Sequence, residues 1–412
     1  MAEASHGRKR VAPRRRGRTS SWQVASSADA ERPDRCGDSS SLAATPHRRA
    51  DFVSLRIVLC AGIILFHALS IFSAEPIYHL KSALPSPAAS VLAEFLRIAI
   101  LPLFFVLAGW SAVSSLRTRS PRGFMRERAQ RLLVPLCTGT ILLGPIIKYV
   151  ELRHGRDIGF HGLWLVPPLQ GSFLEFVPRY FTHRSLLTWS HLWFLAYLFL
   201  VSILLLPLLM RLARSAPRTA MPAAPIVYLP ALAFAALLAA FDGYWPFLPN
   251  LLTDGTNLAW FALCFAIGAG LFAWPGFETR LHAETSRLLV LMLLAYVGVV
   301  LCGPSTAGRA FVGLTAWGAI GAGLGIARRL AAPATPLLTC LNEAVLPVYI
   351  VHLLPVLALG MLVLPLGLPV WLAVAVIWLG AGLVSLAAYR WLIRPWRPMR
   401  WLAGMGSSRV PS

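Results

Sequence analysis

The stretch DFVSLRIVLCAGIILFHALSIFS, residues 51–73, is apolar over a length sufficient to cross a lipid bilayer as a helix. After its first residue, only Arg56 and His67 are ionisable. These two residues are eleven positions apart, which corresponds to three helical turns plus about 20°. We therefore expect their side chains on one face of a single transmembrane helix, about 16 Å apart along its axis.

Arg56 and His67 would be costly inside a membrane unless they face a bundle interior or a wet cavity. An imidazole can act as a general base near neutral pH, and a guanidinium can bind phosphate. Their shared face therefore indicates a site for a long phosphorylated donor whose reactive end reaches His67. The residues alone leave one alternative open: a packed histidine satisfied by a neighbouring helix, with an arginine that extends to the membrane surface.

The composition of the chain is that of an integral membrane protein. Of its 412 residues, 57% are hydrophobic and only 13% are charged. The net charge is +21, but the basic residues gather in the N-terminal tail and in particular loops, as membrane topology would place them. We therefore expect a lipid bilayer and no nucleic acid as a partner. The six cysteines are isolated and lack metal-ligand spacing, so no metal site is expected.

Apolar runs recur along the chain and predict an all-α integral membrane protein, a bundle of about ten transmembrane helices. The predicted spans lie near residues 51–73, 95–116, 130–150, 191–211, 226–241, 256–274, 288–302, 309–327, 337–359 and 370–391. The sequence shows no clear internal repeat and no pair of matching broken helices.

Three regions follow from this pattern. Residues 1–50 are polar and basic without a periodic apolar face, which predicts a disordered cytoplasmic tail. Residues 51–395 form the transmembrane domain, and residues 396–412 form a second basic cytoplasmic tail. Both termini are expected to be cytoplasmic because the tails and the loops after the even-numbered spans carry most of the Lys and Arg. This topology places Arg56 near the cytoplasmic surface and His67 deeper, towards the outer side.

Further ionisable residues accompany the predicted spans. Glu343 and His352 lie in the ninth span. A carboxylate beside a histidine orients the ring and stabilises its protonated form, so we predict that Glu343 is the partner of His67. The alternative is that Glu343 lies at the helix entrance and faces cytoplasmic water. Arg128 and Arg131 are three residues apart, share a helix face at the membrane surface and could clamp a phosphate.

The longest loop, residues 151–190, mixes Trp, Phe, Tyr, His, Arg and Glu with Pro and Gly. Aromatic residues at this height are typical of an interfacial belt, and the alternative is a platform for a sugar-like acceptor. His191 and Trp193 follow at the mouth of the fourth span. We take these two residues, together with His352, as candidate residues of an acceptor pocket.

Five motifs taken together resemble those of the membrane-bound acyltransferase-3 family. They are Arg56-x10-His67, LPLFFVLAGW at 101–110, RLLVP at 131–135, SHLWFL at 190–195 and NEAVLPVYIVH at 342–352. Their order and spacing are similar to those of the family over residues 50–395. SHLWFL and the last motif most closely resemble the glucan biosynthesis protein C branch.

The resemblance implies an enzyme that moves an acetyl or succinyl group from cytoplasmic acyl-CoA to a hydroxyl of a carbohydrate or other acceptor at the outer side. It implies a multi-pass protein of a prokaryotic inner membrane, with acyl-CoA as co-substrate and no permanently bound cofactor. By position, His67 is the implied catalytic base and Arg56 the donor-side arginine.

The resemblance assigns the remaining motif residues less directly. Arg128 and Arg131 fall in the family's basic stretch, and Trp193 falls in its HLWFL motif. Glu343 lies near a position where some members carry a functional acid. Two other classes remain open: a transporter of a glycan or lipid-linked intermediate, whose pathway the buried charges would line, and a membrane scaffold that needs neither charge.

Overall fold

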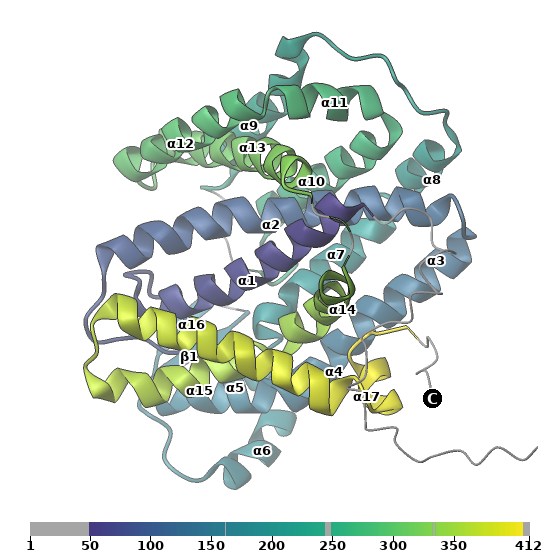
Figure 1. The fold of residues 1–412 in the computed structure, drawn as a ribbon. Helices are drawn as coiled ribbons and strands as arrows, with labels where there is room; N and C mark the ends of the chain where they lie inside the picture. The colour runs from purple at the N-terminus through teal and green to yellow at the C-terminus, as the bar shows by residue number, and fades with distance from the viewer. Residues whose placement is uncertain (1–48, 161, 244–248, 332, 334, 407–412) are drawn as a thin grey trace, which may run out of the picture. The chain divides into compact units, whose positions relative to one another are not determined.

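Helices form nearly all of the described chain (Figure 1). The structure is a computed structural model that describes residues 49–160, 162–243, 249–331, 333 and 335–406. The predicted tail at residues 1–50 lies outside these residues except for its last two positions, and so does the end of the predicted C-terminal tail.

Seven helices of the described chain are long and apolar enough to cross a membrane, and there are up to ten spans if each of three bent helix pairs counts as one. The unbroken spans are α1 (Ala50–Phe72), α2 (Pro87–Leu116), α9 (Leu229–Phe241) with the turn before it, α10 (Gly255–Ala273), α12 (Thr285–Cys302), α13 (Thr306–Arg329) and α16 (Val370–Ala387) with the π-turn after it. The prediction of an all-α membrane bundle is confirmed.

The third, fourth and ninth spans are each divided into two helices. The pairs are α3 and α4 (Pro121–Arg128, Val134–Leu142) with α5 (Gly144–Arg153), α7 (Trp193–Leu204) with α8 (Leu206–Arg214), and α14 (Pro336–Val351) with α15 (Leu353–Val363). They bend by 44°, 61° and 61°, respectively. A proline follows each break within three residues: Pro145, Pro207 and Pro355. Proline lacks the N–H of a helical hydrogen bond and clashes with the preceding turn, which accounts for breaks that hydropathy alone did not reveal.

The long segment before α7 is more ordered than the predicted loop. It contains an antiparallel hairpin, β1 (Arg156–Gly159) with β2 (Gly162–Leu165), in which Arg156 pairs with Leu165. It continues into α6 (Phe173–Thr182), which begins with a capping box. The 3-10 turns Arg184–Leu186 and Ser190–Leu192 then lead into α7. Two more short helices, α11 (Pro275–Ala283) and α17 (Arg397–Leu402), lie outside the spans.

Helix α1 is enclosed by other helices. It contacts α2, α13, α14, α15 and α16, and Figure 1 shows it between α2 and α16. Helices α2 and α10 are packed with their backbones in close contact. A Cβ at Gly109 would overlap the backbone of Phe265, and a Cβ at Gly268 would overlap the backbone of Val106. Small residues allow such contacts in membranes, where packing rather than hydrophobic driving force holds helices together.

Candidate active site

His67 lies in the interior of the bundle, next to two further histidines. Its ring centroid is 5.0 Å from that of His352 and 6.2 Å from that of His191, and those two are 4.9 Å apart. All three side chains are buried. We call His67, His191 and His352 the histidine cluster. The structure thus gathers three predicted site residues from α1, the turn before α7 and the break between α14 and α15.

Two fully buried nitrogen atoms of the histidine cluster have no hydrogen-bond partner among the described residues. His191 Nε2 is 3.0 Å from the carbonyl oxygen of Ile350, and His352 Nδ1 is 2.7 Å from that of Tyr349. A carbonyl only accepts, so each of these nitrogens carries hydrogen, and the other nitrogen of a neutral ring holds a lone pair. Those other nitrogens, His191 Nδ1 and His352 Nε2, are buried and unpartnered within the described residues. The cluster therefore offers acceptor atoms for a hydroxyl-bearing ligand.

His67 is held by the segment that connects α1 to α2. Its Nδ1 is 3.2 Å from the hydroxyl of Tyr78. Lys81 anchors the same segment to the end of α1 by donating to the carbonyl oxygens of Ser70 and Ser73, at 2.7 and 2.5 Å. Burial, together with the nearby charge of Arg156, lowers the pKa of Lys81 to about 8. The connecting segment is thus fixed against the end of α1 that carries His67.

A second buried polar group surrounds His79. Its Nδ1 is 2.5 Å from Glu151 Oε1, and its Nε2 is 3.0 Å from Ser190 Oγ. Lys148 Nζ lies 2.6 Å from Glu151 Oε2 and 2.9 Å from Asp157 Oδ1. The side chains of Glu151 and Lys148 are fully buried. We call these five residues the His79 network.

Sequence analysis assigned no role to any member of the His79 network, although Ser190 is the first residue of the SHLWFL motif. One signal was present: Lys148 and Glu151 are three residues apart at the end of an apolar run, a spacing that pairs opposite charges on one helix face. His79 and Ser190 come from segments 111 residues apart in the chain, and no periodic pattern relates them. The network borders the histidine cluster, because Ser190 precedes His191 and the ring of Tyr78 is 5.3 Å from that of His79.

The three predicted donor arginines gather near the opposite end of α1. Arg56 donates from Nη2 to Ser111 Oγ of α2 at 2.7 Å. Arg131 Nη1 is 3.5 Å from Glu127. Arg128 experiences the charges of both Arg56 and Arg131. Arg128 thus lies near both Arg56 and Arg131, and guanidinium groups are suited to bind a polyanion such as a phosphate.

The structure does not bring Glu343 to His67. Its carboxylate is 3.5 Å from Arg400 Nη1, and its side chain is 37% exposed. No hydrogen bond or ion pair joins it to His67 among the described residues. Glu343 precedes Ile350, which touches the histidine cluster, by seven residues of α14, or about 10 Å along the axis. The alternative of a position at the helix entrance therefore describes Glu343 better.

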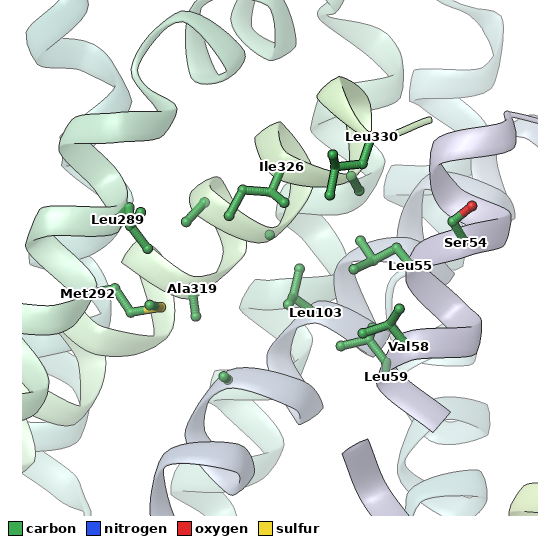
Figure 2. Close-up of a pocket in the computed structure, with 14 residues that line it drawn as sticks. Ser54, Leu55, Val58, Leu59, Leu103, Leu289, Met292, Ala319, Ile326 and Leu330 are labelled. Atoms are coloured by element: carbon green, nitrogen blue, oxygen red, sulfur yellow. The ribbon is translucent and has the colours of Figure 1, made fainter. Parts of the chain in front are cut away.

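Trp193 lies outside the histidine cluster, in an aromatic layer. Its ring centroid is 5.2 Å from Tyr197 and 5.7 Å from Phe261. A separate cavity of about 360 Å³ opens between α1, α2, α12 and α13 (Figure 2). Apolar side chains such as Leu59 and Met292 line it, with no ionisable side chain of the described chain among them. The described residues of this cavity therefore offer no ionisable group for proton transfer or for binding a charged ligand.

Seven to ten apolar helices in the described chain define a multi-pass membrane protein, and this bundle encloses three buried imidazoles, groups that can exchange protons near neutral pH. A protein-family model described as an acyltransferase domain matches residues 51–390. The chain therefore belongs to the acyltransferase-3 family and is a membrane acyltransferase. No curated protein and no solved structure shows a significant match to it. No group of three or more His, Cys, Asp and Glu in the described residues has a geometry that could hold a metal ion.

Proposed function

We propose that the protein transfers an acetyl or succinyl group from cytoplasmic acyl-CoA to a hydroxyl of a glycan at the outer face of a prokaryotic inner membrane, as in the glucan biosynthesis protein C branch. The observation that carries this proposal is that the two ends of α1 lie beside chemically different groups. Its Arg56 end belongs to a group of three arginines, and its His67 end belongs to a cluster of three buried imidazoles.

The spacing on α1 supports a CoA thioester as donor. Arg56 and His67 are separated by eleven residues, about 16 Å of helix. In CoA, an extended pantetheine arm separates the charged phosphates from the sulfur that carries the acyl group. With its phosphates on Arg56, Arg128 and Arg131, the donor would present its thioester towards the histidine cluster.

The grouping of basic helix ends supports a cytoplasmic location for the Arg56 end. Arg49, at the start of α1, pairs with Glu278 of α11. Asp51 interacts with Arg328 at the end of α13. These ends share one side of the bundle, and an excess of Arg marks the cytoplasmic side of membrane proteins. Both termini then face the cytoplasm, and the connecting segment between α1 and α2 faces outward.

In this mechanism His67 is the general base of acyl transfer. It takes the proton of the acceptor hydroxyl as the hydroxyl oxygen attacks the acyl carbonyl. The unpartnered nitrogens of His191 and His352 accept hydrogen bonds from neighbouring hydroxyls of the acceptor and orient it. A sugar suits this arrangement because it presents several hydroxyls at once.

Radiolabelled acetyl-CoA and succinyl-CoA test the proposal in membranes that contain the intact protein, His67→Ala or His183→Ala. His183 is exposed on the segment before α7, so its variant is a matched control. We expect label in a glycan fraction with the intact protein and the control, and none with His67→Ala. Equal labelling by His67→Ala would overturn the role of His67. Absence of labelling by the intact protein with both donors would overturn the donor assignment.

A further inference from the structure

We propose that the acyl group passes through a covalent ester on Ser190, formed with the help of His79 and Glu151. This inference rests on the proposed function, since it adds an intermediate to the same transfer. It is carried by three residues from separate elements: the segment after α1, helix α5 and the turn before α7.

The order of contacts in the His79 network is that of a nucleophile, a base and an orienting acid. Ser190 Oγ is 3.0 Å from His79 Nε2, and His79 Nδ1 is 2.5 Å from Glu151 Oε1. An ionised carboxylate only accepts, so Nδ1 carries the hydrogen of a neutral ring. His79 Nε2 then holds the lone pair, and Ser190 is the donor to it. An imidazole in this tautomer can take the hydroxyl proton of a serine nucleophile.

Glu151 is held as an anion within the bundle. Its side chain is fully buried, and Lys148 Nζ lies 2.6 Å from its second oxygen. A buried carboxylate requires such a partner, because desolvation disfavours an isolated charge. The backbone N–H of Ile158 also donates to Glu151, at 3.2 Å. With its charge maintained, Glu151 stabilises the imidazolium that forms when His79 takes a proton.

The backbone at Ser190 has a conformation rare for a residue with a side chain. Its φ is 45°, and only one other non-glycine residue of the described chain has a positive φ. Such strain persists where surrounding contacts enforce it, and here the N–H of Ser190 donates to Thr188 Oγ1 at 3.0 Å. A sharp turn just before a helix is also how nucleophilic serines are presented in unrelated acyl-transferring enzymes.

Ser190 lies next to the acceptor site. It directly precedes His191, whose ring centroid is 6.2 Å from that of His67. The two buried histidine sets can therefore serve successive half-reactions. His79 assists formation of the ester, and His67 assists its transfer to the acceptor.

In the first half-reaction, Ser190 Oγ attacks the carbonyl carbon of the acyl thioester while His79 Nε2 takes its proton. The O–C bond forms, the C–S bond breaks, and the thiolate leaves as a thiol with the proton from His79. In the second, the acceptor hydroxyl gives its proton to His67 and attacks the ester carbonyl. A new O–C bond forms, the bond to Ser190 breaks, and the proton that His67 took is returned to the Ser190 oxygen, which restores both histidines to their neutral state.

An acyl-trapping experiment tests this inference with purified full-length protein. The protein is mixed with radiolabelled acetyl-CoA without acceptor and quenched in acid, and its peptides are analysed by mass spectrometry. We expect one acetyl group on the Ser190 peptide of the intact protein and of the control Ser185→Ala, whose serine is exposed nearby. Ser190→Ala should carry none. His79→Ala should form the ester on the order of 10²- to 10⁴-fold more slowly, the usual loss of a general base.

His67→Ala separates this inference from the proposed function. We expect it to form the Ser190 ester but to transfer no label to glycans. Full glycan labelling by Ser190→Ala would overturn the ester intermediate and leave the proposed function intact. If Ser190→Ala does not fold, Ser190→Cys replaces it, and we expect acetyl on that cysteine as a thioester. Its absence in folded Ser190→Cys, when label still reaches glycans, would overturn the inference.

A fluorophosphonate probe makes the test independent of the acyl donor, because it reacts with serines activated by a neighbouring base. We expect labelling of Ser190 in the intact protein and its loss in His79→Ala. Labelling of Ser190 would support its activation even if neither CoA ester proved to be a donor. An unlabelled Ser190 in protein that transfers acetyl groups would overturn the inference.

Discussion

The two buried histidine sets differ in their charged partners. The histidine cluster includes no carboxylate contact among the described residues, and its imidazole N–H groups donate to backbone carbonyls. The His79 network contains Glu151, Asp157 and Lys148 in direct ion pairs. One set therefore presents to a ligand acceptor nitrogens that are unpartnered within the described chain, whereas in the other a fixed carboxylate orients an imidazole towards Ser190. Four variants test this difference and the roles of the residues outside both sets.

The largest expected effect is that of His67→Gln on the transfer rate. Glutamine can hydrogen-bond to Tyr78 but cannot act as a base near neutral pH, so we expect a decrease of about 10²- to 10⁴-fold. Label transfer per unit of membrane protein measures this, with His183→Gln as the control. A decrease of less than about 10-fold would contradict the assignment of the proton transfer to the histidine cluster.

Lys148→Met tests the His79 network through its effect on the free energy of unfolding. The side chains of Lys148 and Glu151 are fully buried, and removing one partner leaves a charge unpaired. The expected loss in the free energy of unfolding is about 3–5 kcal/mol. Thermal denaturation in detergent, alongside the exposed control Arg184→Ala, measures it. An unchanged melting temperature would mean that Glu151 is not held there as an anion.

Arg56→Ala is expected to weaken donor binding rather than proton transfer. Loss of hydrogen bonds to a charged group costs about 1.5–3 kcal/mol, which corresponds to a roughly 10- to 150-fold higher KM for acyl-CoA. The KM for the acceptor should stay the same. Initial rates at varied donor and acceptor concentrations distinguish these effects, and a selective rise in the acceptor KM would contradict donor binding by the arginines.

Glu343→Gln should have the smallest effect. Its carboxylate is partly exposed and 3.5 Å from Arg400, and such pairs contribute about 0–1 kcal/mol. We expect a transfer rate within a few-fold of the intact protein. A loss of 100-fold or more would instead restore the catalytic role that the sequence suggested for Glu343.

The sequence predicted the parts of the protein that depend on local pattern. Hydropathy located the spans, and the spacing of Arg56 and His67 on one helix identified the two ends of α1. The motif segments also supplied His191 and His352, which the fold brings to His67.

The remaining features depend on contacts that are distant in the chain. His79 meets Glu151 and Ser190 across separations of 72 and 111 residues. Glu343 interacts with Arg400 of the short helix α17 rather than with the first span. Hydropathy averages over a window, so it did not predict the bends within the third, fourth and ninth spans. Neither pairing between distant polar residues nor the direction of a helix after a break is encoded in periodicity.

The break between α14 and α15 affects which ring nitrogens of His191 and His352 carry hydrogen. The last carbonyls of a helix lack helical partners, and here Tyr349 and Ile350, in the last turn of α14, accept from His352 and His191. The helix breaks at His352, just after these residues, where α14 ends and α15 begins. The interrupted helix thereby selects the tautomers of two imidazoles and leaves their basic nitrogens unpartnered. A bend in the backbone can in this way determine which nitrogen atoms of a candidate site carry hydrogen.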